Sequence, residues 1–468
     1  MLSWISAPFA RGRGTGRRLA AAAVVSGLVA AGALTAAGPA AADATARSQG
    51  GATATMGSLK TYGTAVVHGA EGDQEVSAGL FEMAVDGGGT LQTYCVDLHN
   101  PTQKDAQYHE TQWSGTSLAA NKNAGRVLWI LQHSYPQVND LAALAKKAGV
   151  TGGLTEQDAA AGTQVAIWRY SDGADVDAVD PQAEGLADYL QKAARTVSEP
   201  AASLALDTSA VSGHPGERLG PVIVRTQESA VTVIPPLDAA TTGVRVVDAA
   251  GKPVTTAADG SRLFFDVPEG APDGTAELTL QASTTVPVGR AFTADSRSQT
   301  QILAGSSEST VSATATATWA ARGPVPALSA AKDCTHHGLD VTAANRGDED
   351  FAFSLMGTEY AVAAGQSRTV TIPLQEDQAY DFTIAAQRFT GVLDCRTRSA
   401  ETETADLTTQ TLADPSPATV GGTTTDTNLA ETGGTSATPL IAGTAIALVV
   451  IGGAVLVLLG RRENAAGE

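Results

Sequence analysis

Cys95 is the first residue of this chain whose chemistry needs an explanation. The chain of 468 residues has three cysteines, and two of them, Cys334 and Cys395, make a natural pair that leaves Cys95 over. A thiol without a partner is a liability in an oxidising compartment unless its sulfur is used. Because Cys95 lies in the apolar run 91–98, the sequence predicts a strand whose buried sulfur either packs as a small apolar group or reacts.

Gln164 is the second candidate, and it lies within a predicted helix that spans about residues 155–170. Thr155 is typical of an N-cap, acidic residues follow it in the first turn, and Ser171–Gly173 ends the pattern. At helical spacing Gln164 shares a face with the apolar residues Ala160, Ala161, Ile167 and Trp168. A glutamine on an apolar face costs free energy of burial unless its carboxamide is bonded. A strand that carries Cys95 beneath this helix would supply that bond.

The segments around these two residues, 91–98 and Thr163-Gln-Val-Ala-Ile-Trp168, together resemble the thioester domains of Gram-positive surface adhesins. In that family a cysteine early in the domain bonds to the glutamine of a TQxA motif and ammonia is released. The match is tight at the threonine, glutamine and alanine of the motif, and an aromatic residue follows as it often does in the family. The resemblance implies an internal thioester between Cys95 and Gln164, with motif residues Thr163, Ala166, Trp168 and Tyr94.

Length and charge narrow the classes of function. A chain of 468 residues is too long for one core and indicates about three domains. The formal charge of −19 argues against nucleic acid, because phosphate binding needs a basic surface. His336 and His337 would point to opposite faces of a strand and have no further ligands near them in the sequence. We therefore expect no metal site and no cofactor.

The N-terminal residues 1–42 have the pattern of a signal peptide. Four arginines between Arg11 and Arg18 precede an apolar stretch over 19–37, and the small residues 40–42 form the expected cleavage site. The alternative is an N-terminal membrane anchor. The sequence leaves open whether export follows the general or the twin-arginine route, so it predicts a secreted protein without a defined pathway.

The C-terminal residues 429–468 combine a short motif, an apolar span and a basic tail. Residues 440–459 carry no charge and, at about 1.5 Å per residue, are long enough to cross roughly 30 Å of hydrocarbon. Arg461 and Arg462 would keep that end in the cytoplasm. The motif before the span resembles the sortase sorting signal LAxTG that class E sortases use, and its residues are Leu429, Ala430, Glu431, Thr432 and Gly433. The resemblance implies cleavage after Thr432 and its attachment to peptidoglycan; the alternative is a plain transmembrane anchor.

Between these ends, composition divides the chain into five segments. Residues 43–56 are predicted to be a flexible leader and residues 398–428 a threonine-rich linker that spans the cell wall. Residues 57–199 start with strands and continue with helices near 119–133, 138–148, 155–170 and 181–197, which predicts an α+β thioester domain. Two all-β sandwich-like domains are expected to follow it: a stalk over 200–322, and a smaller domain over 325–397 that a Cys334–Cys395 disulfide closes.

Three classes of function are compatible with this organisation. The resemblance implies a cell-wall-anchored adhesin whose thioester reacts once with an amine, which we expect to be a lysine of a surface target. Such a reagent is consumed in the reaction and is no enzyme. The second class is a secreted cysteine hydrolase, in which Cys95 needs a histidine base such as His99, His109 or His133. The third is a passive structural or interaction protein of the wall.

Overall fold

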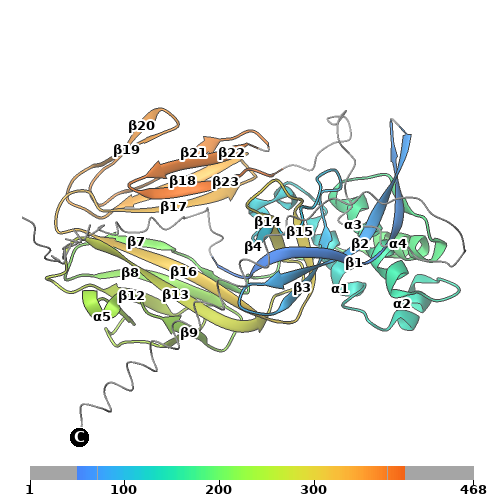
Figure 1. Ribbon diagram of the computed structural model, residues 1–468, viewed down its shortest axis with the longest axis horizontal. Coiled ribbons are helices and arrows are strands. Elements are labelled where there is room, and N and C mark those ends of the chain that lie inside the picture. The colour runs from blue at the N-terminus through green and yellow to red at the C-terminus, as the bar shows by residue number, and fades with distance from the viewer. Residues whose placement is uncertain (1–49, 71, 377, 396–468) are drawn as a thin grey trace, which may run out of the picture. The chain divides into compact units, whose positions relative to one another are not determined.

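The computed structural model describes residues 50–70, 72–376 and 378–395, and strands dominate this part of the chain (Figure 1). The predicted signal peptide (1–42), the threonine-rich linker (398–428) and the sorting signal with its apolar span (429–468) lie outside the described residues. Among the described residues no helix has the length and apolar character needed to span a membrane.

A seven-stranded antiparallel sheet forms the first unit of the structure. Its order is β2-β3-β15-β14-β4-β1-β5, and β1 also pairs with β2, so six of the strands close into a ring and β5 pairs with β1 beside it. The strands are β1 (Thr53–Gly69), β2 (Gly72–Val85), β3 (Thr90–Cys95), β4 (Gln107–Thr111), β5 (Val176–Ala178), β14 (Ala291–Ala294) and β15 (Gln301–Ser306). We call this closed sheet the barrel.

Helices cover part of the barrel, as the sequence predicted. They are α1 (Ala124–His133), α2 (Leu141–Ala148), α3 (Glu156–Ser171) and α4 (Pro181–Ala193), and two 3₁₀ turns, Trp113–Gly115 and Ser117–Ala119, precede them. A capping box starts α3: the Thr155 hydroxyl accepts the Asp158 N–H at 3.1 Å, and the Asp158 carboxylate accepts the Thr155 N–H at 2.8 Å. Because α3 packs on β1 and β2, the face of this helix that carries Gln164 is directed at the strands.

Two further sheets form a second β-rich unit. Most of its strands lie in the sequence between β5 and β14 of the barrel, and β16 follows β15. The orders of the two sheets are β10-β12-β8-β6 and β11-β9-β13-β16-β7. The elements are β6 (Leu204–Leu206), β7 (Ala210–Gly213), β8 (Arg218–Thr226), β9 (Val231–Ile234), α5 (Ala239–Thr242), β10 (Arg245–Val247), β11 (Thr256–Ala257), β12 (Arg262–Asp266), β13 (Gly274–Thr285) and β16 (Glu308–Trp319). Alternate residues of these strands, such as Val224, Phe265 and Leu280, are buried in the core.

Two predicted boundaries differ from the structure. The predicted stalk over 200–322 contains β14 and β15, which pair with β4 and β3 of the barrel instead of the stalk sheets. The predicted leader over 43–56 overlaps β1, where Ala54 and Met56 are buried. Local patterns of apolar residues indicate that a segment is a strand, but they do not identify its pairing partner. The stalk sheets are therefore an insertion in the barrel rather than a domain that follows it.

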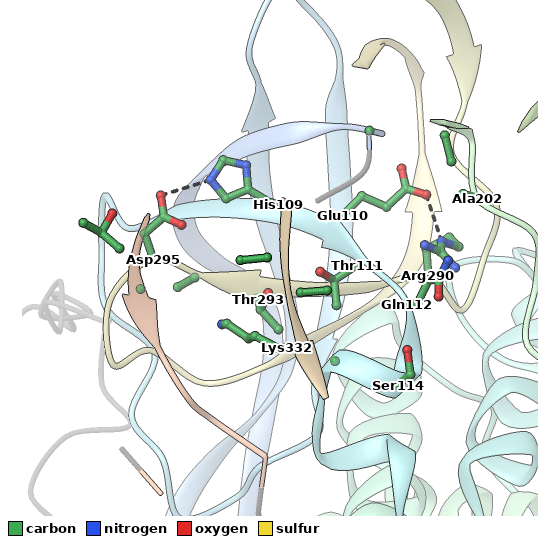
Figure 2. Close-up of a pocket in the computed structure, with 18 of the residues that line it drawn as sticks. His109, Glu110, Thr111, Gln112, Ser114, Ala202, Arg290, Thr293, Asp295 and Lys332 are labelled. Carbon is green, nitrogen blue, oxygen red and sulfur yellow. Dashed lines mark hydrogen bonds and ion pairs between the residues drawn. The ribbon is translucent and has the colours of Figure 1, made fainter. Parts of the chain in front are cut away.

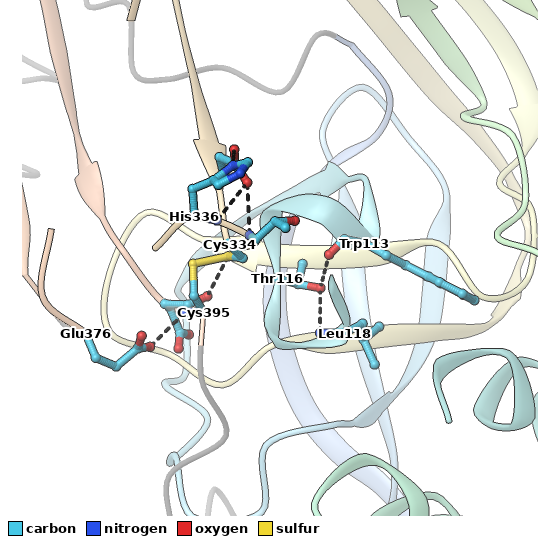
Figure 3. The surroundings of a disulfide bond; sticks show 10 residues. Trp113, Thr116, Leu118, Cys334, His336, Glu376 and Cys395 are labelled. Carbon is cyan, nitrogen blue, oxygen red and sulfur yellow. Dashed lines mark hydrogen bonds and ion pairs between the residues drawn. A yellow bond between two sulfur atoms is a disulfide. The ribbon is translucent and has the colours of Figure 1, made fainter. Parts of the chain in front are cut away.

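The last described unit consists of three small sheets. The predicted disulfide links the residue after β17 to the segment of the chain that follows β23. The sheets are β17-β18-β21, β19-β20 and β22-β23. Their strands are β17 (Pro326–Asp333), β18 (Gly338–Asn345), β19 (Phe351–Leu355), β20 (Thr358–Val362), β21 (Ser367–Pro373), β22 (Ala379–Ile384) and β23 (Gln387–Val392). Cys334 and Cys395 are bonded, which confirms the predicted pair (Figure 3). The backbone N–H of Cys395 also donates to Glu376 at 2.7 Å.

Removal of this disulfide is expected to destabilise the unit that it closes. The bond joins residues 61 positions apart, and closing a loop of that length stabilises the fold by about 4 kcal/mol in the chain-entropy model. We expect the double variant Cys334→Ser/Cys395→Ser to unfold this unit at lower urea concentration than the wild type. Denaturation with and without reductant measures the effect, and the variant itself should not respond to reductant. Equal midpoints for the two proteins would contradict the prediction.

Candidate functional site

Cys95 is the last residue of β3 and only 2% of its surface is exposed. Its strand lies between β2 and β15 in the barrel. Since side chains alternate along a strand, Cys95 and Thr93 point to the same face and Tyr94 points to the other. After Cys95 the chain forms a loop, residues 96–106, before β4 starts at Gln107.

The structure brings Gln164 to Cys95 as the sequence predicted, but the contact is with the backbone of Cys95. The Gln164 carbonyl oxygen accepts the Cys95 N–H at 3.0 Å, and its amide nitrogen donates to the Cys95 carbonyl oxygen at 2.9 Å. Gln164 is fully buried in the middle of α3. Its carboxamide thus satisfies both backbone groups at the end of β3, which is the role that a neighbouring strand plays elsewhere in a sheet.

The carboxamide that faces the sulfur belongs to Gln301, the first residue of β15. Gln301 was not among the candidates that the sequence pattern indicated. Gln301 is directly opposite Cys95 in the antiparallel register, so both side chains lie on one face. The Gln301 amide nitrogen is 3.4 Å from the Cys95 sulfur, and its carbonyl oxygen accepts the Thr93 hydroxyl at 2.9 Å. Gln301 is also fully buried. A nucleophilic sulfur and an acyl group therefore meet between two paired strands.

The surroundings keep the Cys95 thiol protonated. Burial raises the pKa of the thiol to about 12, Asp97 and Asp172 add to the rise, and hydrogen bonds with Gln301 and Thr102 oppose it. Burial likewise raises the pKa of Asp172 well above its ordinary range, with a further contribution from Asp97. At neutral pH the sulfur is thus a thiol with little thiolate character, so a reaction at this sulfur requires that its proton be accepted as the new bond forms.

The other residues of the predicted motif belong to the core around the site. Tyr94 is fully buried and its hydroxyl donates to the Tyr135 carbonyl oxygen at 2.9 Å. Trp168 is 1% exposed, and its indole N–H is buried without a hydrogen-bond partner. The Thr163 hydroxyl donates within α3 to the Ala159 carbonyl oxygen at 2.6 Å, and Ala166 is fully buried. These side chains fix α3 against the barrel and hold Gln164 in place.

Two of the histidines considered for a hydrolase are engaged elsewhere. His109 pairs with Asp295 at 3.0 Å and with the Thr53 hydroxyl at 3.2 Å. The His133 ring stacks on Trp129 with ring centroids 3.9 Å apart and bonds the Trp129 carbonyl oxygen. The groups within hydrogen-bonding distance of the Cys95 sulfur are Gln301 and Thr102, and neither is the histidine that a cysteine hydrolase needs. This environment gives no support to the hydrolase hypothesis.

A cavity of about 120 Å³ lies away from these residues (Figure 2). Its lining includes residues of β4, β6, β14 and the disulfide-closed unit, and it does not include Cys95, Gln164 or Gln301. Figure 2 shows two polar pairs in its wall, a hydrogen bond between His109 and Asp295 and an ion pair between Glu110 and Arg290. The second pair is buried: the Arg290 Nε donates to Glu110 at 2.8 Å, and both side chains are at most 3% exposed.

Comparison with known proteins identifies the part of the chain that contains this site. Residues 92–202 match the family model described as the thioester domain. The match supports a thioester domain in this part of the chain. No curated protein matches the chain.

Two solved structures are similar to the chain at low identity. The Bacillus anthracis TIE protein is 12% identical, with 74% of this chain and 81% of that one covered and a TM-score of 0.26. The thioester domain of the Enterococcus faecium TIE86 protein is 15% identical, with 57% and 96% covered and a TM-score of 0.26. At these TM-scores neither similarity carries an inference about the fold.

The matched range contains Cys95 and Gln164 and ends before Gln301. The inserted stalk sheets begin just after it and separate β15 from the other barrel strands in the sequence. The local signal at Gln301 is a Thr-Gln pair, Thr300–Gln301, that comes directly before the apolar run 302–304 and is one of six such pairs in the chain. That signal shows a polar side chain next to a buried strand, but it does not show that the strand pairs with β3.

Proposed function

We propose that this protein is a surface adhesin that binds its target covalently through an internal thioester between Cys95 and Gln301. The observation that carries the proposal is the 3.4 Å contact between the Cys95 sulfur and the Gln301 amide nitrogen in the buried barrel. The match of residues 92–202 to the thioester-domain family supports the same chemistry. The resemblance alone implied Gln164 as the acyl partner, and that assignment stays a prediction.

The hydrogen bonds favour Gln301 over Gln164 as the acyl donor. Both amide atoms of Gln164 are bonded to the Cys95 backbone, which directs that carboxamide along the strand and away from attack by the sulfur. The Gln301 amide instead lies against the sulfur, with its oxygen held by Thr93. In this proposal Gln164 positions β3 and Gln301 reacts.

The two steps of the reaction balance without an external oxidant or cofactor. In the first, a bond forms between the Cys95 sulfur and the Gln301 acyl carbon, the bond from that carbon to the amide nitrogen breaks, and ammonia carries away the thiol proton. In the second, a target amine attacks the acyl carbon, the bond to sulfur breaks, and Cys95 regains a proton as the amide forms. Since Gln301 ends as a substituted amide, the protein acts once and is not an enzyme.

The place of action in this proposal is the bacterial cell wall. The signal peptide over 1–42 would export the protein, and a class E-like sortase would join Thr432 to peptidoglycan. The barrel would then lie outside the cell, joined to the wall through the stalk sheets, the disulfide-closed unit and the threonine-rich linker. A lysine amine on a neighbouring surface is the expected target.

Intact mass and thiol titration of the exported protein test the proposed bond. The protein has to include residues 291–306, because β14 and β15 complete the barrel. We expect the wild type to weigh one ammonia less than its sequence, to contain no titratable Cys95 thiol after unfolding in urea, and to gain one methylamine on incubation with that amine. Cys95→Ala should have the sequence mass and bind no methylamine. A wild type with the sequence mass and a titratable thiol would instead indicate a passive wall protein.

A further inference from the structure

The loop after β3 places a hydroxyl group against both reacting residues. Thr102 lies in this loop, is 8% exposed, and has its oxygen 3.7 Å from the Cys95 sulfur and 3.3 Å from the Gln301 amide nitrogen. Its own hydrogen is donated to the Gln299 carbonyl oxygen at 2.7 Å. The Thr102 oxygen therefore directs its lone pairs toward the thiol and toward the amide that the thiol would attack.

Thioester formation at this site raises a problem of proton transfer. The attacking group is a protonated thiol, and the departing group is an amide nitrogen that leaves only as ammonia. One proton has to leave sulfur and reach nitrogen as the bonds change. A hydroxyl that touches both atoms can accept the first proton and donate its own, so no net charge is created in the buried site.

The acyl oxygen needs a second kind of assistance. Negative charge develops on the Gln301 carbonyl oxygen when sulfur adds to the acyl carbon, and a donor already aimed at this oxygen stabilises that charge. The Thr93 hydroxyl donates to this oxygen at 2.9 Å from the same face of β3 as Cys95. The three residues Thr93, Cys95 and Thr102 therefore surround the amide of Gln301.

We propose that Thr102 and Thr93 catalyse formation of the Cys95–Gln301 thioester. Thr102 accepts the sulfur proton and donates its hydroxyl proton, which turns from Gln299 to the departing nitrogen. Thr93 holds the acyl oxygen while the bond from sulfur to carbon forms and the bond from carbon to nitrogen breaks. Ammonia leaves, and both threonines end as they began. This proposal rests on the proposed thioester and adds the residues that make it form.

The rate of thioester formation tests the role of each hydroxyl. Concentrated ammonia should reverse the condensation in the full exported chain, and removal of ammonia then starts its formation again. We follow the loss of one ammonia by intact mass over time in the wild type, Thr102→Val, Thr102→Ser and Thr93→Val. We expect Thr102→Val and Thr93→Val to be slower by about 10²-fold or more, and Thr102→Ser to stay within about tenfold of the wild type.

Thr300→Val is the matched control, because Thr300 is fully buried next to Gln301 and its hydroxyl has no hydrogen-bond partner. Its rate should equal that of the wild type, and circular dichroism should show that all variants are folded. If Thr102→Val fails to fold, the comparison of Thr93→Val with Thr300→Val still tests the proposed catalysis. Equal rates of thioester formation in the wild type, Thr102→Val and Thr93→Val would overturn the catalytic roles of the two threonines but not the thioester itself. A wild type that never loses ammonia would overturn both proposals.

Discussion

Gln301→Met is expected to abolish the thioester completely, whereas Gln164→Met is expected to leave it in place. Methionine is close to glutamine in size and lacks an acyl group, so each variant removes one candidate donor. In Gln301→Met the sulfur loses the carboxamide that lies 3.4 Å away, and every molecule should keep its sequence mass and a free thiol. In Gln164→Met the Gln301 amide still faces the sulfur, and the loss of one ammonia should still occur.

The two variants are also expected to differ in stability, and here Gln164→Met is the one with the larger effect. Gln164→Met leaves the buried N–H and carbonyl of Cys95 without the partners that they have in the wild type. Each backbone group left unpaired costs about 1–3 kcal/mol, so we expect the barrel to unfold at clearly lower urea concentration. Peptide mapping of the wild-type cross-link gives an independent answer. A cross-linked peptide that contains Gln164 would contradict our assignment and support the one implied by the resemblance.

Arg290→Met is expected to destabilise the protein by about 3–5 kcal/mol, because it leaves the buried Glu110 carboxylate without its cation. Glu110 also accepts the backbone N–H of Ala52 at 3.1 Å and that of Ser203 at 3.0 Å, so it joins the start of β1 to the chain that enters the stalk sheets. The loss should therefore reach both units. Urea denaturation of the folded protein, followed by circular dichroism, measures this change.

The matched control is Arg225→Met, since Arg225 pairs with Asp207 on the surface of the stalk sheets. Both side chains are more than 40% exposed there, and an exposed ion pair contributes about 0–1 kcal/mol. A similar loss of stability in Arg225→Met and Arg290→Met would show that burial does not govern the strength of the Glu110 pair. A loss below 1 kcal/mol in Arg290→Met would have the same meaning.

Local patterns predicted the helices of the barrel unit well. Thr155 and Asp158 indicated the start of α3, and both capping hydrogen bonds are present. The burial of Gln164 followed from its position on the apolar face of the helix. The structure shows its carboxamide hydrogen-bonded to the Cys95 backbone, as expected because an unpaired buried carboxamide would cost free energy. These predictions succeeded because each depends on residues that are close in sequence or on one recognisable motif.

Gln301 could not be predicted in this way. Its strand pairs with β3, but the helices and most of the inserted stalk sheets lie between the two strands in the sequence. The barrel strands are therefore not consecutive along the chain. Apolar alternation predicts a strand near 302 but gives no information on register over such a distance. The two glutamines that meet Cys95 play different parts, and only the three-dimensional arrangement separates the one bonded to its backbone from the one facing its sulfur.

The direct connection between β15 and β16 has a mechanical consequence. One residue, Ser307, separates the two strands, so Gln301 lies at the start of a strand that continues into the stalk sheets. If a target is bonded to Gln301 and the C-terminus is held, tension runs from Gln301 toward that end and bypasses all helices of the barrel unit. At Cys334 the disulfide passes the tension straight to Cys395. The covalent line under load thus includes β15, β16 and β17, and the pull acts along strands that are already extended.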